Sequence, residues 1–136
     1  MDGAASWASL MLRLASGLVF MAHGLPKLRR EEPNPAIGRT RLRTAIEQMG
    51  FPRPVFWVYA VALTELLGGA MLVLGLFTLW VAMVLAVVMG TATCWMHSKF
   101  GFASGSDFPF ALLFAMVALI FLGDGRFSLG ALLGLN

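Results

Sequence analysis

The chain consists of long apolar runs separated by short polar segments, a pattern that predicts a bundle of membrane-spanning helices. Apolar residues dominate positions 7–25, 54–74, 79–97 and 108–123, and each run is long enough, or nearly so, for one helix to cross a bilayer. Pro26 ends the first run, and Gly75 opens the turn between the second and third. We therefore predict an all-α fold: a polytopic membrane protein with four antiparallel transmembrane helices in a single domain, residues 1–136.

The connection between the first two runs, residues 27–53, carries most of the charge in the chain. Its ionisable residues are Lys27, Arg29, Arg30, Arg39, Arg41, Arg43 and Arg53 against Glu31, Glu32 and Glu47. The segment 33–35, Pro-Asn-Pro, predicts an extended or turned middle.

Within that connection, residues 39–49 show the pattern of an amphipathic helix. The apolar residues Leu42, Ala45, Ile46 and Met49 recur at i, i+3, i+4 and i+7, while the arginines take the other faces. Such a helix lies in the plane of a membrane interface, and we expect it to cover one end of the bundle.

Composition supports a membrane protein and restricts its chemistry. Hydrophobic residues make up 59% and charged residues 12% of the chain, and the mean hydropathy is +0.81. Soluble proteins carry roughly 25% charged residues. The single cysteine, Cys94, excludes an intrachain disulfide and a Cys-x-x-Cys pair, so redox chemistry would need an outside cofactor or partner.

Charge distribution predicts an orientation in the membrane. The net charge of +3 comes largely from residues 27–53, and we attribute it to topology rather than to nucleic-acid binding. The positive-inside rule places this loop in the cytoplasm and both chain ends outside. The predicted location is the cell inner (cytoplasmic) membrane, with the lipid bilayer and other membrane protein subunits as partners and no nucleic acid.

One carboxylate, Glu65, stands in the middle of the second apolar run. It lies roughly 16 Å below the Pro54 end at ~1.5 Å of rise per residue, which is near mid-membrane. Arg13, in the first run, lies roughly 20 Å from the Pro26 end by the same rise, so we predict that the two pair. The pair is either a structural device that fixes helix register or part of a site in which Glu65 accepts protons or binds a quinone headgroup.

A second polar group is expected where the first and third helices end on the same membrane face. It contains His23, Lys27 and His97, which could reach a headgroup, a metal ion or a quinone carbonyl. Alternatively, the two histidines lie at the membrane interface without a functional role, and water or backbone groups form hydrogen bonds with their rings. Metal binding, with Asp107 or Cys94 as further ligands, is the weaker alternative, because no compact ligand spacing marks a metal motif, and we predict no metal. Trp57 and Trp95 are typical interface anchors.

The order of these motifs resembles the DoxX family over about residues 10–133. The similarity rests on the segments Arg13-Leu14, His23-Gly24-Leu25-Pro26-Lys27-Leu28, Gly50-Phe51-Pro52, Thr64-Glu65-Leu66-Leu67-Gly68-Gly69, Leu74-Gly75-Leu76-Phe77-Thr78, His97, Gly101-Phe102 and Gly123-Asp124-Gly125-Arg126-Phe127-Ser128-Leu129. The resemblance implies a small four-helix membrane protein associated with membrane redox systems, including quinol-linked sulfur oxidation and thiol- or superoxide-detoxifying complexes.

Two functions follow as hypotheses. In the first, the chain is the membrane subunit of a redox assembly, whose interior binds a quinone headgroup or relays protons through Arg13, His23, Lys27, Glu65 and His97, with quinone or quinol as the cofactor. Glu65 and His23 are then the candidates for a catalytic role. In the second, the chain is a non-catalytic accessory or scaffold subunit of a larger membrane complex. The lack of a complete set of catalytic residues favours this second hypothesis. Transport is less favoured, because four short helices leave little room for an alternating-access path.

Overall fold

The computed structural model describes residues 3–29 and 38–134, and all the regular secondary structure in these residues is helical. Four helices are long and apolar enough to cross a membrane: α1 (Gly3–Leu28), α3 (Pro54–Leu74), α4 (Thr78–Phe100) and the segment Phe102–Leu122, which joins a π-helical turn, η1 (Phe102–Ser106), to α5 (Asp107–Leu122). The predicted membrane bundle is confirmed. The predicted turn at 33–35 lies outside the described residues.

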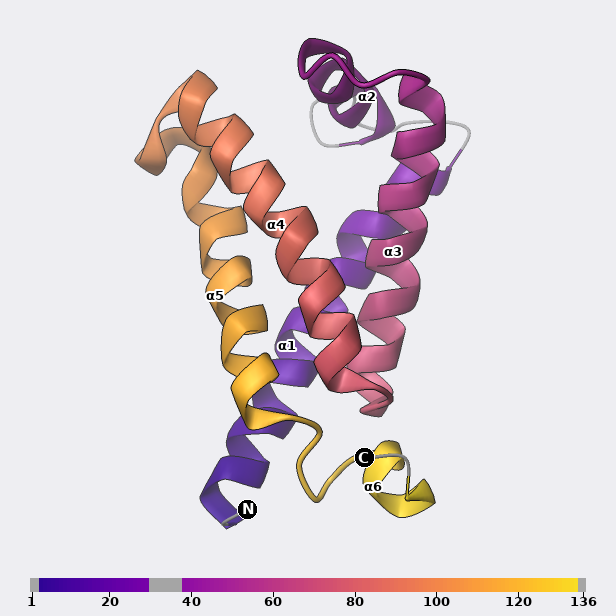
Figure 1. Cartoon of the computed structure of the whole chain (residues 1–136), viewed down its shortest axis with the longest axis vertical. Helices are drawn as coiled ribbons and strands as arrows, with labels where there is room; N and C mark the ends of the chain where they lie inside the picture. The colour runs from indigo at the N-terminus through magenta and orange to yellow at the C-terminus, as the bar shows by residue number, and fades with distance from the viewer. Residues whose placement is uncertain (1–2, 30–37, 135–136) are drawn as a thin grey trace.

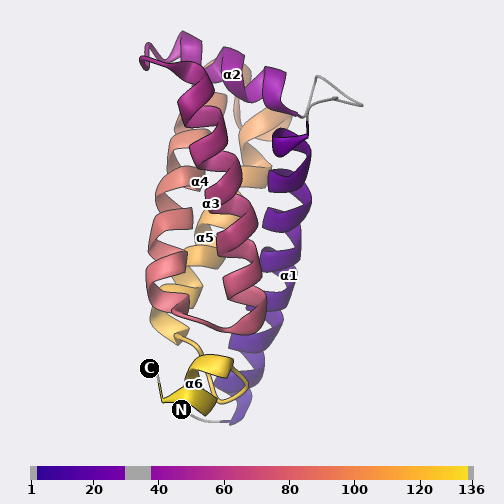
Figure 2. The same cartoon turned by 90° about the vertical axis from the view of Figure 1, so that its right-hand side faces the viewer.

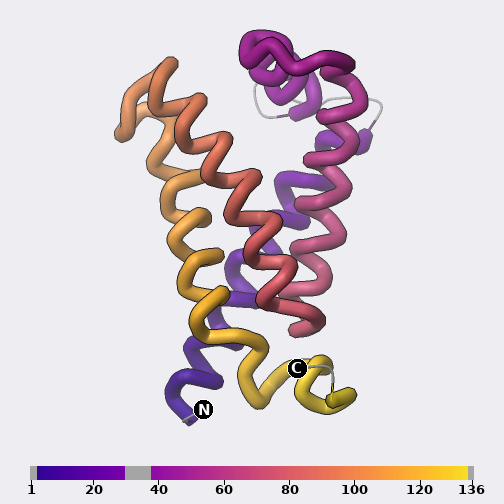
Figure 3. Tube along the Cα trace, in the orientation of Figure 1, coloured from indigo at the N-terminus to yellow at the C-terminus, as the bar shows by residue number. Residues whose placement is uncertain are grey.

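The four long helices form two pairs that diverge from one end of the molecule to the other. α1 packs chiefly on α3, and α4 packs chiefly on α5. Figures 1 and 3 show the pairs close together near the chain termini and apart at the opposite end. The buried apolar core includes Phe20, Leu72, Leu85, Met116 and Leu119, so it joins all four helices.

Two glycines set the contact between α1 and α3. A Cβ on Gly17 would lie 2.7 Å from the carbonyl oxygen of Gly69, and a Cβ on Gly69 would lie 2.6 Å from the carbonyl oxygen of Gly17. Real side chains do not approach this closely, so only glycine allows the two backbones to meet here. This contact fixes how far each helix is shifted along the other.

A tight turn joins α3 to α4 at the narrow end of the bundle. Gly75 adopts φ 68°, its N–H donates to the carbonyl of Leu72, and the Leu76 N–H donates to Met71. This is the Schellman arrangement that ends many helices, and glycine takes the left-handed position at no steric cost. α3 begins with Pro54 in its first turn, where a missing N–H is harmless.

A shorter helix covers the wide end. α2 (Arg39–Gln48) buries Ala45 and Ile46 and lies across that end in Figure 2. It also makes a hydrogen bond of 3.1 Å from Arg39 Nη1 to the Tyr59 hydroxyl on α3. The helix therefore exists at the predicted position, while its place at the membrane surface stays a prediction.

Pro26 does not end the first helix. α1 continues to Leu28 and so keeps Lys27 on the helix, one turn beyond Gly24. At the opposite end of the molecule, a five-residue helix, α6 (Leu129–Leu133), is capped by Ser128, whose hydroxyl accepts a hydrogen bond from the Ala131 N–H.

Candidate functional site

Glu65 pairs with Lys27. The Lys27 ammonium contacts Glu65 Oε2, and only 12% of the Lys27 side chain and 4% of the Glu65 side chain are exposed. Gly24, one turn before Lys27, makes the approach possible, because a Cβ there would lie 2.9 Å from Ala62 O and 3.2 Å from the Cβ of Glu65. The pair is therefore built by close contact between α1 and α3.

The predicted pairing of Arg13 with Glu65 is wrong. It assumed that Pro26 and Pro54 stand at the same depth, whereas the contact of Gly17 with Gly69 shifts α3 outward past the end of α1. Glu65 consequently lies level with Gly24, and Arg13 lies roughly 16 Å further along α1 at ~1.5 Å per residue. Depth counted from helix ends cannot reveal such a shift.

A cavity of about 610 Å³ opens in front of the ion pair. It lies between the diverging helix pairs and beneath α2, at the wide end of Figure 1. Its polar lining includes Lys27, Glu65, His23, Arg41, Thr91 and Ser104, and its aromatic lining includes Trp57, Trp95 and Phe108. We call this cavity the polar chamber. Its volume is typical of small-molecule sites, and its few polar groups stand among apolar walls.

Trp95 lines the chamber and carries a hydrogen-bond donor, its indole N–H. Its indole Nε1 is buried, and no acceptor among the described residues pairs with it. A buried N–H without a partner is costly and uncommon in folded proteins. Trp95 and Trp57, interpreted from the sequence as interface anchors, thus both face a cavity.

The two histidines are not equivalent. The Nδ1 atom of His23 lies 2.9 Å from the Val19 carbonyl oxygen, so Nδ1 donates to that carbonyl, and Nε2 is an acceptor when the ring is neutral. Its ring stacks on Phe108 with centroids 5.1 Å apart, and both residues line the polar chamber. His97 is exposed near the end of α4 and does not line the chamber. Within residues 3–29 and 38–134, no three His, Cys, Asp or Glu side chains gather at one point.

Arg13 serves a different part of the molecule. It is fully buried, and its Nη2 donates a hydrogen bond of 2.5 Å to the carbonyl oxygen of Phe127. Ser9, one turn earlier on α1, donates a 2.6 Å hydrogen bond to the Gly123 carbonyl, and the Trp7 ring lies 4.6 Å from the Phe127 ring. One face of α1 therefore holds the loop between α5 and α6.

The same loop also joins the α3–α4 turn. Asp124 Oδ1 accepts a hydrogen bond of 2.9 Å from the Thr78 N–H, and the Gly130 N–H donates to the Gly75 carbonyl at 2.9 Å. Arg13 packs against Gly75, where a Cβ would collide with its guanidinium. The sequence contains a signal for this polar contact: Ser6, Ser9, Arg13 and Ser16 fall on one helical face.

The family model for DoxX matches residues 8–98, which is most of α1 to α4 and includes both members of the ion pair. The chain belongs to the DoxX family. It is also similar to a protein of Bacillus subtilis (strain 168) named "Putative oxidoreductase CatD", with 30% identity over 116 residues, which cover 85% of this chain and 79% of that protein. No solved structure matches the chain. This DoxX protein is a multi-pass membrane protein, and its four spans hold an ion pair beside a cavity.

Proposed function

We propose that the protein is the membrane subunit of a redox assembly in the cytoplasmic membrane and that its polar chamber binds the headgroup of a quinone or quinol. The observation that carries this proposal is a buried Lys27–Glu65 ion pair facing a cavity of about 610 Å³, which is also lined by Trp95, a residue whose buried indole N–H has no acceptor among the described residues. An ion pair inside a membrane bundle is costly to maintain, and such groups mark functional sites by default.

The residues of the polar chamber fit a quinone headgroup. Its carbonyl oxygens need hydrogen-bond donors, which the Trp95 N–H and the Lys27 ammonium can supply. Its flat ring needs apolar or aromatic walls, which Trp57, Trp95 and Phe108 offer. When bound, a quinone supplies two-electron, two-proton redox chemistry.

The polar side chains of the chamber provide places for the protons of such chemistry. Lys27 can give a proton from Nζ, and Glu65, in contact with Lys27, can accept one at Oε2. His23 offers Nε2 as an acceptor because Nδ1 is engaged by Val19. We therefore assign proton exchange to Lys27, Glu65 and His23, and headgroup orientation to Trp95.

The proposed redox reaction also needs a group that exchanges electrons with the quinone. The one cysteine of the chain, Cys94, cannot form a redox disulfide within it, so a second subunit or cofactor must carry electrons to or from the quinone. The Bacillus subtilis relative is named as an oxidoreductase, which supports a redox role for the assembly.

The test is purification from the native membrane in mild detergent, followed by solvent extraction and quantification of bound quinone and identification of co-purifying subunits. We expect quinone in a fixed ratio to the protein, together with a redox subunit. Co-purifying subunits without quinone would favour the accessory or scaffold function instead.

A further inference from the structure

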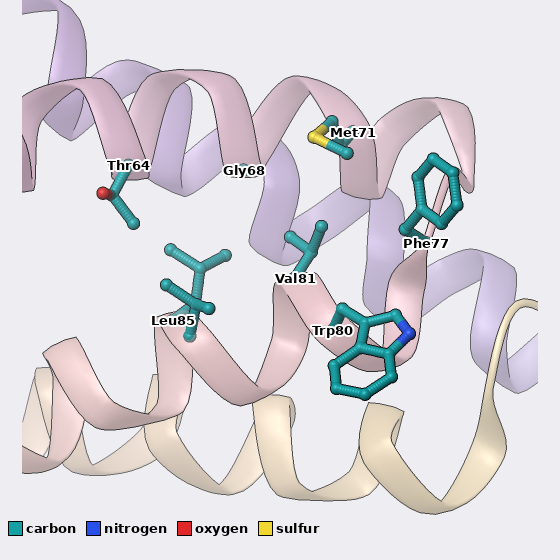
Figure 4. Close-up of a pocket in the computed structure, with 8 residues that line it drawn as sticks. Thr64, Gly68, Met71, Phe77, Trp80, Val81 and Leu85 are labelled. Carbon is teal, nitrogen blue, oxygen red and sulfur yellow. The ribbon is translucent and has the colours of Figure 1, made fainter.

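A second cavity lies in the crevice between α3 and α4, closer to the turn that joins them. Its volume is about 520 Å³, and its lining side chains are apolar apart from the Thr64 hydroxyl and the Trp80 indole N–H. Figure 4 shows Thr64, Gly68 and Met71 of α3 facing Val81, Leu85 and Trp80 of α4 across it. We call this cavity the apolar groove.

The apolar groove and the polar chamber lie along the same face of α3. Trp57 and Val61 line the chamber, and Thr64, Gly68 and Met71 line the groove. These positions alternate in steps of four and three, so they form a single stripe along the helix. Along that stripe, the lining of the groove begins where the lining of the chamber ends.

The facing side of α4 repeats this arrangement. Trp95, Thr91 and Val88 line the chamber, and Val84 and Val81 line the groove, again in steps of four and three. The two cavities therefore follow one another along the α3–α4 interface, with donors and charges lining the chamber and mainly apolar side chains lining the groove.

The crevice is accessible from the lipid. Val87, at the rim of the chamber, is 71% exposed, and Val84, at the rim of the groove, is 53% exposed. Both side chains belong to a membrane-spanning helix, so the surface they expose faces hydrocarbon. A molecule dissolved in the bilayer can enter between α3 and α4 without passing through water.

The geometry points to a ligand with a long hydrocarbon tail that enters laterally from the bilayer: its headgroup occupies the polar chamber, and its tail lies along the apolar groove towards Trp80. The inference rests on the proposed function and adds the substrate class, a lipophilic long-tailed quinone rather than a water-soluble one. From Val61 to Met71 the α3 stripe runs roughly 15 Å at ~1.5 Å per residue, enough to align a tail segment.

Bilayer lipid also contains hydrocarbon chains, so the tail needs a reason to displace them. Lipid chains and groove side chains are similarly apolar, and burial alone gives the tail little advantage. A headgroup held by Trp95 and the Lys27–Glu65 pair would keep the tail next to the groove and raise its local concentration there. Occupancy of the groove should therefore depend on occupancy of the chamber.

Photo-crosslinking in phosphatidylcholine nanodiscs tests this arrangement. Two benzoquinone probes with the same long alkyl tail are used, one with a diazirine on the ring and one with a diazirine near the tail end, and labelled peptides are located by mass spectrometry. We expect the ring probe to label peptides containing Lys27 or Trp95. The tail probe should label residues 64–71 and 77–85, and excess tailless benzoquinone should suppress that labelling.

A pair of matched variants supplies the control. Val84→Trp fills the groove from its exposed rim, and we expect it to reduce tail labelling several-fold while ring labelling persists. Val55→Trp, at a residue of α3 that is 48% exposed and lines neither cavity, should leave both labels unchanged.

The possible failures are distinguishable. Ring labelling in the chamber with tail labelling spread over outward residues such as Phe121 of α5 would overturn the tail assignment and leave the proposed function standing. Absence of ring labelling in the chamber would overturn both. Equal tail labelling in wild type and Val84→Trp would likewise remove the groove from the site.

Discussion

Gly17 of α1 and Gly69 of α3 meet backbone to backbone, each lying where the other would need to place a Cβ. This contact sets the shift between the two helices, and two turns further along α1 Gly24 lies against Glu65. The glycine contact therefore brings Lys27 and Glu65 together as an ion pair, and both residues line the polar chamber.

Replacing Gly69 with alanine should push α1 away from α3. A Cβ there would lie 2.6 Å from Gly17 O, so we expect a loss of about 1–3 kcal/mol, the usual range for overpacking. Denaturant unfolding in detergent measures it. Gly90→Ala is the matched control, because its nearest neighbour would lie 4.0 Å away, and helix propensity alone predicts a neutral or slightly stabilising effect. Equal losses in the two variants would contradict the glycine contact.

Replacing Lys27 with methionine should leave the Glu65 carboxylate without its partner in a buried position. Breaking a buried pair from one side costs about 3–5 kcal/mol, whereas the double variant Lys27→Met with Glu65→Leu should recover much of the loss. A double-mutant cycle from unfolding in detergent gives the coupling free energy. A coupling of zero would show that the two side chains are not partners.

Replacing Arg13 with leucine should destabilise the loop between α5 and α6. The change removes a charge-assisted hydrogen bond to Phe127 O, for which we expect a loss of about 1.5–3 kcal/mol and faster proteolysis at residues 123–128. Because Arg13 does not line the polar chamber, quinone bound per folded molecule should stay at the wild-type level. A loss of bound quinone with an unchanged free energy of unfolding would contradict this and show that Arg13 takes part in binding.

Replacing Trp95 with phenylalanine removes the indole N–H and keeps an aromatic ring in the chamber. Losing one hydrogen bond to a ligand carbonyl is worth about 0.5–1.5 kcal/mol, or roughly a twofold to tenfold loss of quinone affinity. Titration of the reconstituted protein with quinone measures it. Trp7→Phe, which changes a tryptophan that lines neither the chamber nor the groove, should retain the wild-type quinone affinity.

A reporter fused after Asn136 should behave as a non-cytoplasmic domain. Four spans return the C-terminus to the side opposite the basic connection, which the positive-inside rule assigns to the cytoplasm. An enzymatic reporter that is active only outside the cytoplasm checks this directly. Activity of a cytoplasm-specific reporter at the same site would reverse the topology and place α2 on the outer face.

Local features of the sequence determined the helices. The apolar runs required four spans because a bilayer leaves backbone groups no other partner, and Pro54 and Gly75 marked both ends of α3. The spacing of Leu42, Ala45 and Ile46 likewise indicated α2. The end of α1 was predicted too early, at the residue before Pro26. A proline biases its predecessor away from the helical conformation without forbidding it.

Only the tertiary structure decided which side chains meet. Lys27, His23 and Glu65 were predicted as site residues, but Glu65 was given the wrong partner, because the shift between α1 and α3 depends on a steric contact of two glycines. The divergence of the helix pairs, which opens the polar chamber beside Trp95 and the ion pair, is a property of packing between elements. Periodicity in one helix fixes which residues share a face, and it leaves open what that face will touch.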